Sequence, residues 1–249
     1  MNFLKKICYG LLCKIYRFSI GIWYKIKFRK INIRNLNSEC LKYTNKVNLN
    51  NILYLNEKQV IKSLYQETFI FNDKEIIKLL KFIFDKKFKK FLQEKNNCCF
   101  SVDFLSIYKN KYLTFDESLE SIYANLFHID KPFSKYTLKV FIPINVKSDE
   151  FGPLEIKVIN PLKQSKKYKA KEYLKLFTEN NHTNIFLFNP SQNYHRACVP
   201  KKGKESINII FQLNPSRYWS YSSQLFKRQF KVEPNFPEIR NLKSKKIKF

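Results

Sequence analysis

The second half of the chain is a series of short apolar runs separated by turn residues, and this pattern restricts the fold most. The runs between residues 98 and 216 are CCFSVDFLSIY, SIYANLFHID, YTLKVFIPINV, LEIKVIN, NIFLFN and SINIIFQLNPS. Several alternate apolar with polar residues, as strands with one buried face do. Gly152 and Gly203 fall between runs, where turns need such residues. The pattern predicts an antiparallel sandwich or barrel.

A helix is predicted ahead of these runs, in KEIIKLLKFIFDKKFKKFLQE. Apolar residues recur there at helical spacing: Ile76, Leu79, Leu80, Ile83 and Phe84. Asp73 is a suitable N-cap, and Glu75 lies in the first turn. We therefore expect one amphipathic helix from about Lys74 to Glu94, with a solvated lysine face.

The length of 249 residues suits one sizeable domain, and 44% hydrophobic residues can form its core. We expect a basic N-terminal segment over residues 1–50, a β domain with helical additions over 51–226, and a basic, poorly ordered tail over 227–249. The expected class is mainly β with N-terminal helices.

The first thirty residues interleave apolar with basic side chains, including Lys14 and Arg17. The uncharged stretches 7–13 and 18–24 are shorter than the roughly 20 residues that a membrane span needs. No small-residue cleavage site follows, which argues against a signal peptide. Two readings stay open: a basic amphipathic helix on an anionic membrane surface, and a helix that caps the domain.

The net charge of +27 favours anionic partners, unless it only reflects biased composition. No nucleic-acid-binding module is recognisable, so nucleic acid is not expected as the main partner. The six cysteines include no CxxC pair and no spacing typical of a zinc site or a disulfide framework. Reduced thiols and a cytoplasmic location fit best. Peripheral contact with a membrane is compatible with this location.

Two of the three histidines stand in contexts that suggest a metal site. His128 and Asp130 are two residues apart at the end of a β-run, so on a strand both project from one face. His195 follows another β-run and a turn. Two histidines and one carboxylate leave coordination positions open on one side of a metal, the arrangement used for oxygen chemistry at non-haem Fe(II). His182, in the polar stretch ENNHTN, is interpreted as a surface residue.

The stretch from Ser121 to Trp219 resembles the phytanoyl-CoA dioxygenase-like branch of the Fe(II)/2-oxoglutarate-dependent oxygenases. The matching segments, in the family's order and spacing, are FHID, TLKVFIPINVKSDEFGPLEI and NIFLFNPSQNYHRACVPKKGKESINIIFQLNPSRYW. The resemblance implies a double-stranded β-helix, a jelly-roll or cupin-like barrel. It also implies that His128, Asp130 and His195 are the metal ligands and the catalytic centre at the mouth of that barrel.

This resemblance further implies Fe(II), 2-oxoglutarate as cosubstrate, and O2. In the family, 2-oxoglutarate is decarboxylated to succinate and carbon dioxide while the substrate is hydroxylated. The carboxylate of Asp130 favours hydroxylation over halogenation, because halogenating members lack it. The expected substrate is a small or lipid-like molecule, and a basic rim would suit an anionic one.

One position departs from the family pattern. About eleven residues after the distal histidine, the family commonly has an arginine whose planar fork pairs with the far carboxylate of 2-oxoglutarate. Ser206 stands at that position. Three other cations could take this role: Lys139, Arg196 and Lys204. Lys204 would share a strand face with Ser206. A second reading therefore stays open: a non-catalytic or altered-cosubstrate descendant that binds metal and acts as a binding module.

Overall fold

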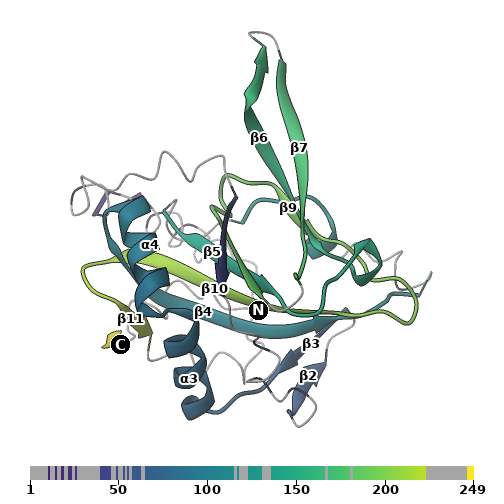
Figure 1. Cartoon of the computed structure of the whole chain (residues 1–249), viewed down its shortest axis with the longest axis horizontal. Helices are drawn as coiled ribbons and strands as arrows, with labels where there is room; N and C mark the ends of the chain where they lie inside the picture. The colour runs from purple at the N-terminus through teal and green to yellow at the C-terminus, as the bar shows by residue number, and fades with distance from the viewer. Residues whose placement is uncertain are drawn as a thin grey trace.

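The computed structural model describes residues 40–45, 58–62, 65–114, 123–130, 136–165, 168–179, 182–222 and 246–249, with a few isolated positions elsewhere. Within these residues, two β-sheets and two α-helices form the molecule (Figure 1). The strands pair antiparallel, apart from one short parallel contact between β11 and β4. The predicted mainly β class is confirmed.

The main sheet has nine strands, and seven of them lie in the order β1-β8-β5-β10-β4-β11-β12, while β3 joins the edge of β4 and β2 joins β3. Their bounds are β1 Leu41–Asn45, β2 Val60–Lys62, β3 Gln66–Phe69, β4 Cys99–Asn110, β5 Leu138–Pro143, β8 Thr183–Phe188, β10 Ser206–Ser216, β11 Ser220–Ser222 and β12 Lys246–Lys248. The long strands β4 and β10 pair with each other over their whole length.

The minor sheet has the strand order β7-β6-β9, with bounds Tyr168–Leu176, Leu154–Ser165 and His195–Ala197. The β6–β7 hairpin projects from the body of the molecule (Figure 1). A 3-10 turn at Asp149–Phe151 leads into β6 through Gly152, whose φ is 69°. A Cβ at Gly152 would lie 2.4 Å from the carbonyl oxygen of Cys198, so only glycine fits there.

The predicted single helix is two helices, α3 (Asp73–Ile83) and α4 (Lys86–Asn96). The break follows from Asp85, whose side chain accepts a hydrogen bond from Phe88 N at 2.7 Å and caps a new helix. The predicted N-cap was also wrong by one residue. Asn72, not Asp73, caps α3 through a capping box with Glu75.

The two faces of the main sheet pack against different partners. On β10, Ile209, Phe211 and Leu213 join the apolar core formed with α3 and α4, where the ring of Phe211 meets Phe84 edge-on at 5.3 Å between centroids. The alternate residues of β10, including Ile210, face the minor sheet instead. A smaller apolar cluster lies between the sheets: Phe141, Leu154, Ile156, Leu176, Phe186 and Phe188.

Part of the chain's end is ordered, contrary to the expectation for the tail. Lys246–Lys248 forms β12 against β11, and the ring of Phe249 lies 6.1 Å from that of Phe84. Residues 227–245 and most of 1–39 lie outside the described residues, and the boundaries of the domain predicted over 51–226 stay a prediction. Among the described residues, no helix has the length and apolarity to span a membrane.

Candidate metal centre

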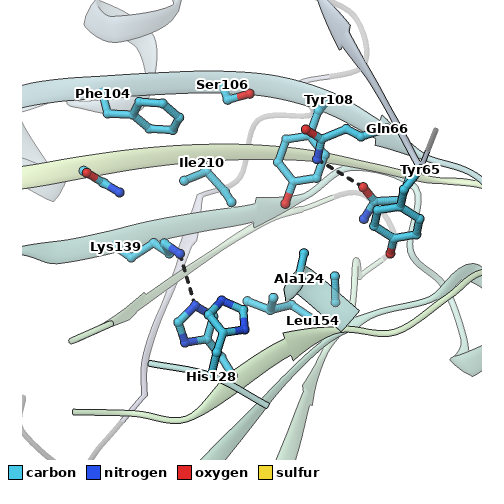
Figure 2. A pocket seen from close by; sticks show the side chains of 14 residues that line it. Tyr65, Gln66, Phe104, Ser106, Tyr108, Ala124, His128, Lys139, Leu154 and Ile210 are labelled. Atoms are coloured by element: carbon cyan, nitrogen blue, oxygen red, sulfur yellow. Dashed lines mark hydrogen bonds between the residues drawn. The ribbon is translucent and has the colours of Figure 1, made fainter. Parts of the chain in front are cut away.

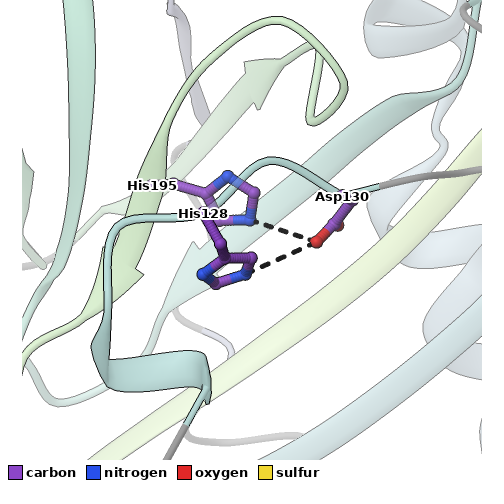
Figure 3. Close-up of side chains that lie close together, drawn as sticks. All are labelled: His128, Asp130 and His195. Carbon is purple, nitrogen blue, oxygen red and sulfur yellow. Dashed lines mark ion pairs between the residues drawn. The ribbon is translucent and has the colours of Figure 1, made fainter.

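His128, Asp130 and His195 converge on one point, as Figure 3 shows. The Nε2 atoms of His128 and His195 lie 3.5 and 3.6 Å from Oδ1 of Asp130. Neighbouring donors bonded to one ion at about 2.1 Å are about 3 Å apart when the angle between the bonds is near 90°. The spacing therefore fits a shared metal ion after a small inward movement of the side chains.

The backbone assembles these ligands without the predicted strand through SIYANLFHID. None of the described residues 123–130 belongs to a strand, and Tyr123–Asn125 forms a 3-10 turn. His128 instead forms an isolated bridge with His195: His128 N donates to His195 O at 3.1 Å, and His195 N donates to His128 O at 2.9 Å. Asp130 N donates to Pro190 O at 2.8 Å. Because pairing occurs at single residues, no strand ladder forms.

Backbone carbonyls fix the tautomers of both histidines. His128 Nδ1 lies 2.8 Å from Leu126 O, and His195 Nδ1 lies 2.9 Å from Asn193 O. A carbonyl oxygen only accepts hydrogen bonds, so each Nδ1 carries the hydrogen and each Nε2 presents a lone pair. Metal-binding histidines are oriented in this way. The donor set therefore fits a divalent transition metal such as Fe(II).

The charge states at the site also suit a metal. Burial lowers the pKa of the His195 imidazole, and the nearby charge of Lys139 lowers it further, against the opposing effect of Asp130. Burial alone would raise the pKa of the Asp130 carboxyl, but the nearby His195 ring and the ammonium group of Lys139 outweigh burial and lower that pKa. A neutral imidazole thus faces an ionised carboxylate.

Lys139 is the one sequence-proposed cosubstrate ligand that lies at this site. It projects from β5 on the side of His128 (Figure 2) and is 8% exposed. Its Nζ lies 2.6 Å from Asp130 Oδ2 and 3.2 Å from His195 Nε2. Its neighbours across the sheet are Gln212 of β10 and Phe188 of β8. A buried cation therefore stands directly beside two of the three candidate metal ligands.

The other three proposed cosubstrate ligands do not line the cavity. Arg196 donates from Nε to Glu155 Oε2 at 2.7 Å. Lys204 is exposed and precedes β10, so it does not share a strand face with Ser206. Ser206 is fully buried and its hydroxyl accepts a hydrogen bond from Asn208 Nδ2 at 3.3 Å.

A cavity of about 240 Å³ adjoins the candidate ligands (Figure 2). It is lined by Tyr65, Gln66, Phe104, Ser106, Tyr108, Asn110, Ala124, His128, Lys139, Leu154, His195, Ala197, Ile210 and Gln212. Lys139 is the one lysine or arginine among these described residues, and none of them is an aspartate or glutamate.

Sequence reasoning missed the polar wall of this cavity, which comes from β3, β4 and the residue before β3. Gln66 donates to Asn110 Oδ1 at 3.2 Å, and Tyr65 and Tyr108 stand beside them. These residues precede the segment that carries the family resemblance. The available signal was the alternation along β4, which places Ser106, Tyr108 and Asn110 on one face.

Comparison with protein-family models found no match, and comparison with curated proteins found none either. Solved structures do resemble the chain. A 2OG-Fe(II) oxygenase family oxidoreductase from Burkholderia pseudomallei is 9% identical, with a TM-score of 0.51 over 74% of this chain and 87% of that one. SnoN, a non-heme alpha-ketoglutarate-dependent epimerase from nogalamycin biosynthesis, is 7% identical, with a TM-score of 0.50 over 76% and 83%.

SnoN has also been solved with Fe3+, alpha-ketoglutarate and nogalamycin RO bound, and that structure has a TM-score of 0.50 to this chain at 6% identity. At such identities the likeness shows the fold alone. The chain thus shares the fold of structures from the 2-oxoglutarate/Fe(II) oxygenase family. Membership of the phytanoyl-CoA dioxygenase-like branch stays a prediction, as does closure of the two sheets into a jelly-roll barrel.

Proposed function

We propose that this chain is an Fe(II)- and 2-oxoglutarate-dependent dioxygenase that hydroxylates a small or lipid-like substrate. The main support is the convergence of one carboxylate and two Nε2 atoms at a cavity in this fold, with each imidazole oriented by a backbone carbonyl and the carboxylate paired with Lys139. His128, Asp130 and His195 would hold the metal and leave positions on its cavity side open.

When bound, iron with 2-oxoglutarate and O2 would supply the oxidation that converts a C–H bond to C–OH and yields succinate and carbon dioxide. The chain's own contribution is orientation and exclusion of water. Phe104, Leu154 and Ile210 provide apolar walls to the cavity, while Ser106 and Tyr108 provide hydroxyl groups. An anionic substrate or cosubstrate would find its counter-ion in Lys139.

Lys139 is the preferred candidate for the far carboxylate of 2-oxoglutarate, since it is the one lysine or arginine among the described cavity residues. An ammonium group binds a carboxylate as a point charge and with less direction than the arginine fork would. The hydroxyl group of Tyr108 and the amide of Gln66 line the same cavity and offer further hydrogen bonds to an anion, whereas the hydroxyl of Tyr65 donates to Cys198 O at 3.3 Å.

The test is turnover of the cosubstrate. Full-length protein reconstituted with Fe(II) without oxygen, and then given O2 and 2-oxoglutarate, is expected to form succinate. His128→Ala should abolish this, because it removes one of three ligands, and His182→Ala is the matched control because His182 is an exposed histidine outside the site. Absence of both Fe(II) binding and succinate formation in the unsubstituted protein would exclude the proposal. Because SnoN, which has a similar fold, is an alpha-ketoglutarate-dependent epimerase, succinate formation alone does not identify a hydroxylase. The product formed from the substrate must be identified as well.

A second candidate function is a metal-binding module with no cosubstrate or a different one. It is supported by Ser206 at the position of the usual arginine and by the ion pair of Lys139 with Asp130. This alternative predicts that Fe(II) binds while a calorimetric titration with 2-oxoglutarate gives no heat. Measurable affinity for 2-oxoglutarate in the iron-loaded protein rejects it.

We also propose that the N-terminal segment contacts an anionic membrane surface. Leu11, Ile15, Phe18, Ile22 and Ile26 are helical, recur at helical spacing, and are 44–72% exposed. Trp23, also exposed, suits the water–lipid interface. The full chain should co-sediment with phosphatidylserine-containing vesicles, and the double change Ile15→Glu with Phe18→Glu should reduce binding. Tyr112→Glu, at another exposed residue, is the control, and equal losses from both would reject the proposal.

A further inference from the structure

The candidate metal site contains a cation of its own. Asp130 uses Oδ1 toward the two histidines and Oδ2 toward Lys139, at 2.6 Å. The same Nζ lies 3.2 Å from His195 Nε2. Because Nδ1 of His195 donates to Asn193 O, Nε2 accepts the hydrogen bond from the ammonium group of Lys139.

This hydrogen bond and a metal bond exclude each other. A neutral imidazole has a single lone pair on Nε2, so His195 can accept a hydrogen from Lys139 or bind a metal ion, but not both. A divalent ion at the site would also repel an ammonium group held this close, and the repulsion is strong where water is excluded. Metal binding therefore requires the Lys139 Nζ to move.

The displaced ammonium group stays inside the protein. Lys139 is 8% exposed and its strand lies between β8 and β10, so the side chain turns into the adjoining cavity rather than into solvent. A buried charge is costly unless it is paired. None of the described residues that line the cavity is an aspartate or glutamate, so apart from Asp130 beside it a further counter-ion for the displaced ammonium group would come from a ligand.

We propose that Lys139 is a positioning residue that couples the two ligands of this site: it holds Asp130 and His195 in the metal-free protein, and after metal binding it pairs with a carboxylate-bearing ligand. This inference rests on the proposed function. The metal then binds weakly alone and more tightly with a carboxylate ligand present. Thermodynamic linkage requires the reverse effect to be equally large.

The experiment measures Co(II) affinity of the full chain without oxygen, by the visible absorption of bound Co(II), with and without 2-oxoglutarate. In the unsubstituted protein, 2-oxoglutarate is expected to tighten Co(II) binding at least about tenfold. Lys139→Met keeps the length of the side chain and removes its charge. Without 2-oxoglutarate, this variant is expected to bind Co(II) at least about tenfold more tightly than the unsubstituted protein does, and 2-oxoglutarate should raise its Co(II) affinity by a smaller factor. Lys147→Met, at an exposed residue outside the cavity, should match the unsubstituted protein.

Lys139→Gln provides a second charge-free variant in case Lys139→Met does not fold. Equal or weaker Co(II) affinity in a folded charge-free variant overturns the coupling, as does a Co(II) affinity of the unsubstituted protein that 2-oxoglutarate leaves unchanged. Co(II) binding to the variants but not to the unsubstituted protein supports displacement and rejects the proposed catalysis. Absence of Co(II) binding in all proteins rejects the metal site, and with it both proposals.

Discussion

The two faces of the main sheet differ in chemistry along the same strand. On β10, Ile209, Phe211 and Leu213 meet the helices and are fully buried among apolar side chains. On the other face, Ser206 and Asn208 are equally buried but polar. The helix-covered face packs apolar side chains that stabilise the fold. The face toward the minor sheet borders the cavity and the candidate metal ligands. Substitutions on the two faces should therefore separate stability from binding.

The largest expected effect is on the helix-covered face. Phe211→Ala should lower the free energy of unfolding by about 3–5 kcal/mol, because it leaves a cavity beside Phe84. Gln212→Ala, the next residue and on the cavity face, should cost less than about 1 kcal/mol. Denaturant titration measures both values. Similar losses for the two variants would remove the distinction between the faces.

A smaller effect on stability, together with an effect on metal binding, is expected from a substitution at Gly152, on the side of the minor sheet. Gly152→Ala should cost more than about 2 kcal/mol, since its φ is positive and the added Cβ meets Cys198 O at 2.4 Å. It should also weaken metal binding, because Cys198 follows β9, the strand that carries His195. Gly203→Ala is the matched control: its φ is also positive, but nothing lies within 4 Å of its Cβ, so a cost of about 1 kcal/mol is expected. A metal affinity unchanged in Gly152→Ala would contradict this link.

The smallest effect concerns Glu67 of β3, the strand between β2 and β4. Burial opposes ionisation of Glu67, but hydrogen bonds from Lys111 and Lys109 lower the pKa of its carboxyl. A depressed folded-state pKa contributes stability that is present above the ordinary value of 4.5 and is lost as pH falls through the lowered value. The stability difference between the unsubstituted protein and Glu67→Gln should be about 1 kcal/mol at pH 7 and shrink below pH 4.5. A difference independent of pH would show that ionisation of Glu67 is not its source.

Some strands could be predicted closely from their short apolar runs. The run SINIIFQLNPS coincides with β10, Ser206–Ser216, because alternating burial on both faces leaves one register that satisfies the sheet. The helical region was less predictable. Helical periodicity continues through Phe84 and Asp85, and the break depends on whether the Asp85 side chain caps a new helix, which a hydrophobic pattern does not reveal.

The candidate metal ligands could be named from the sequence, although the local structure predicted for them was wrong. His128 pairs with His195 through one backbone bridge, and Asp130 N donates to Pro190 O, so neither ligand projects from a strand. Lys139 was one of four candidate cosubstrate ligands, and nothing in TLKVF distinguishes it. Its selection depends on which strands flank β5, and that is a property of the tertiary fold.

The backbone bridge between His128 and His195 means that these two residues should separate from each other in a single step. Each residue donates its amide hydrogen to the carbonyl oxygen of the other, so an opening of the segment around His128 breaks both hydrogen bonds at once. Solvent hydrogen exchange at the two amides should then proceed at a common rate, and a bound ion should slow both equally. The site would lose its imidazoles in one event, with the dissociation rate of the ion limited by backbone opening.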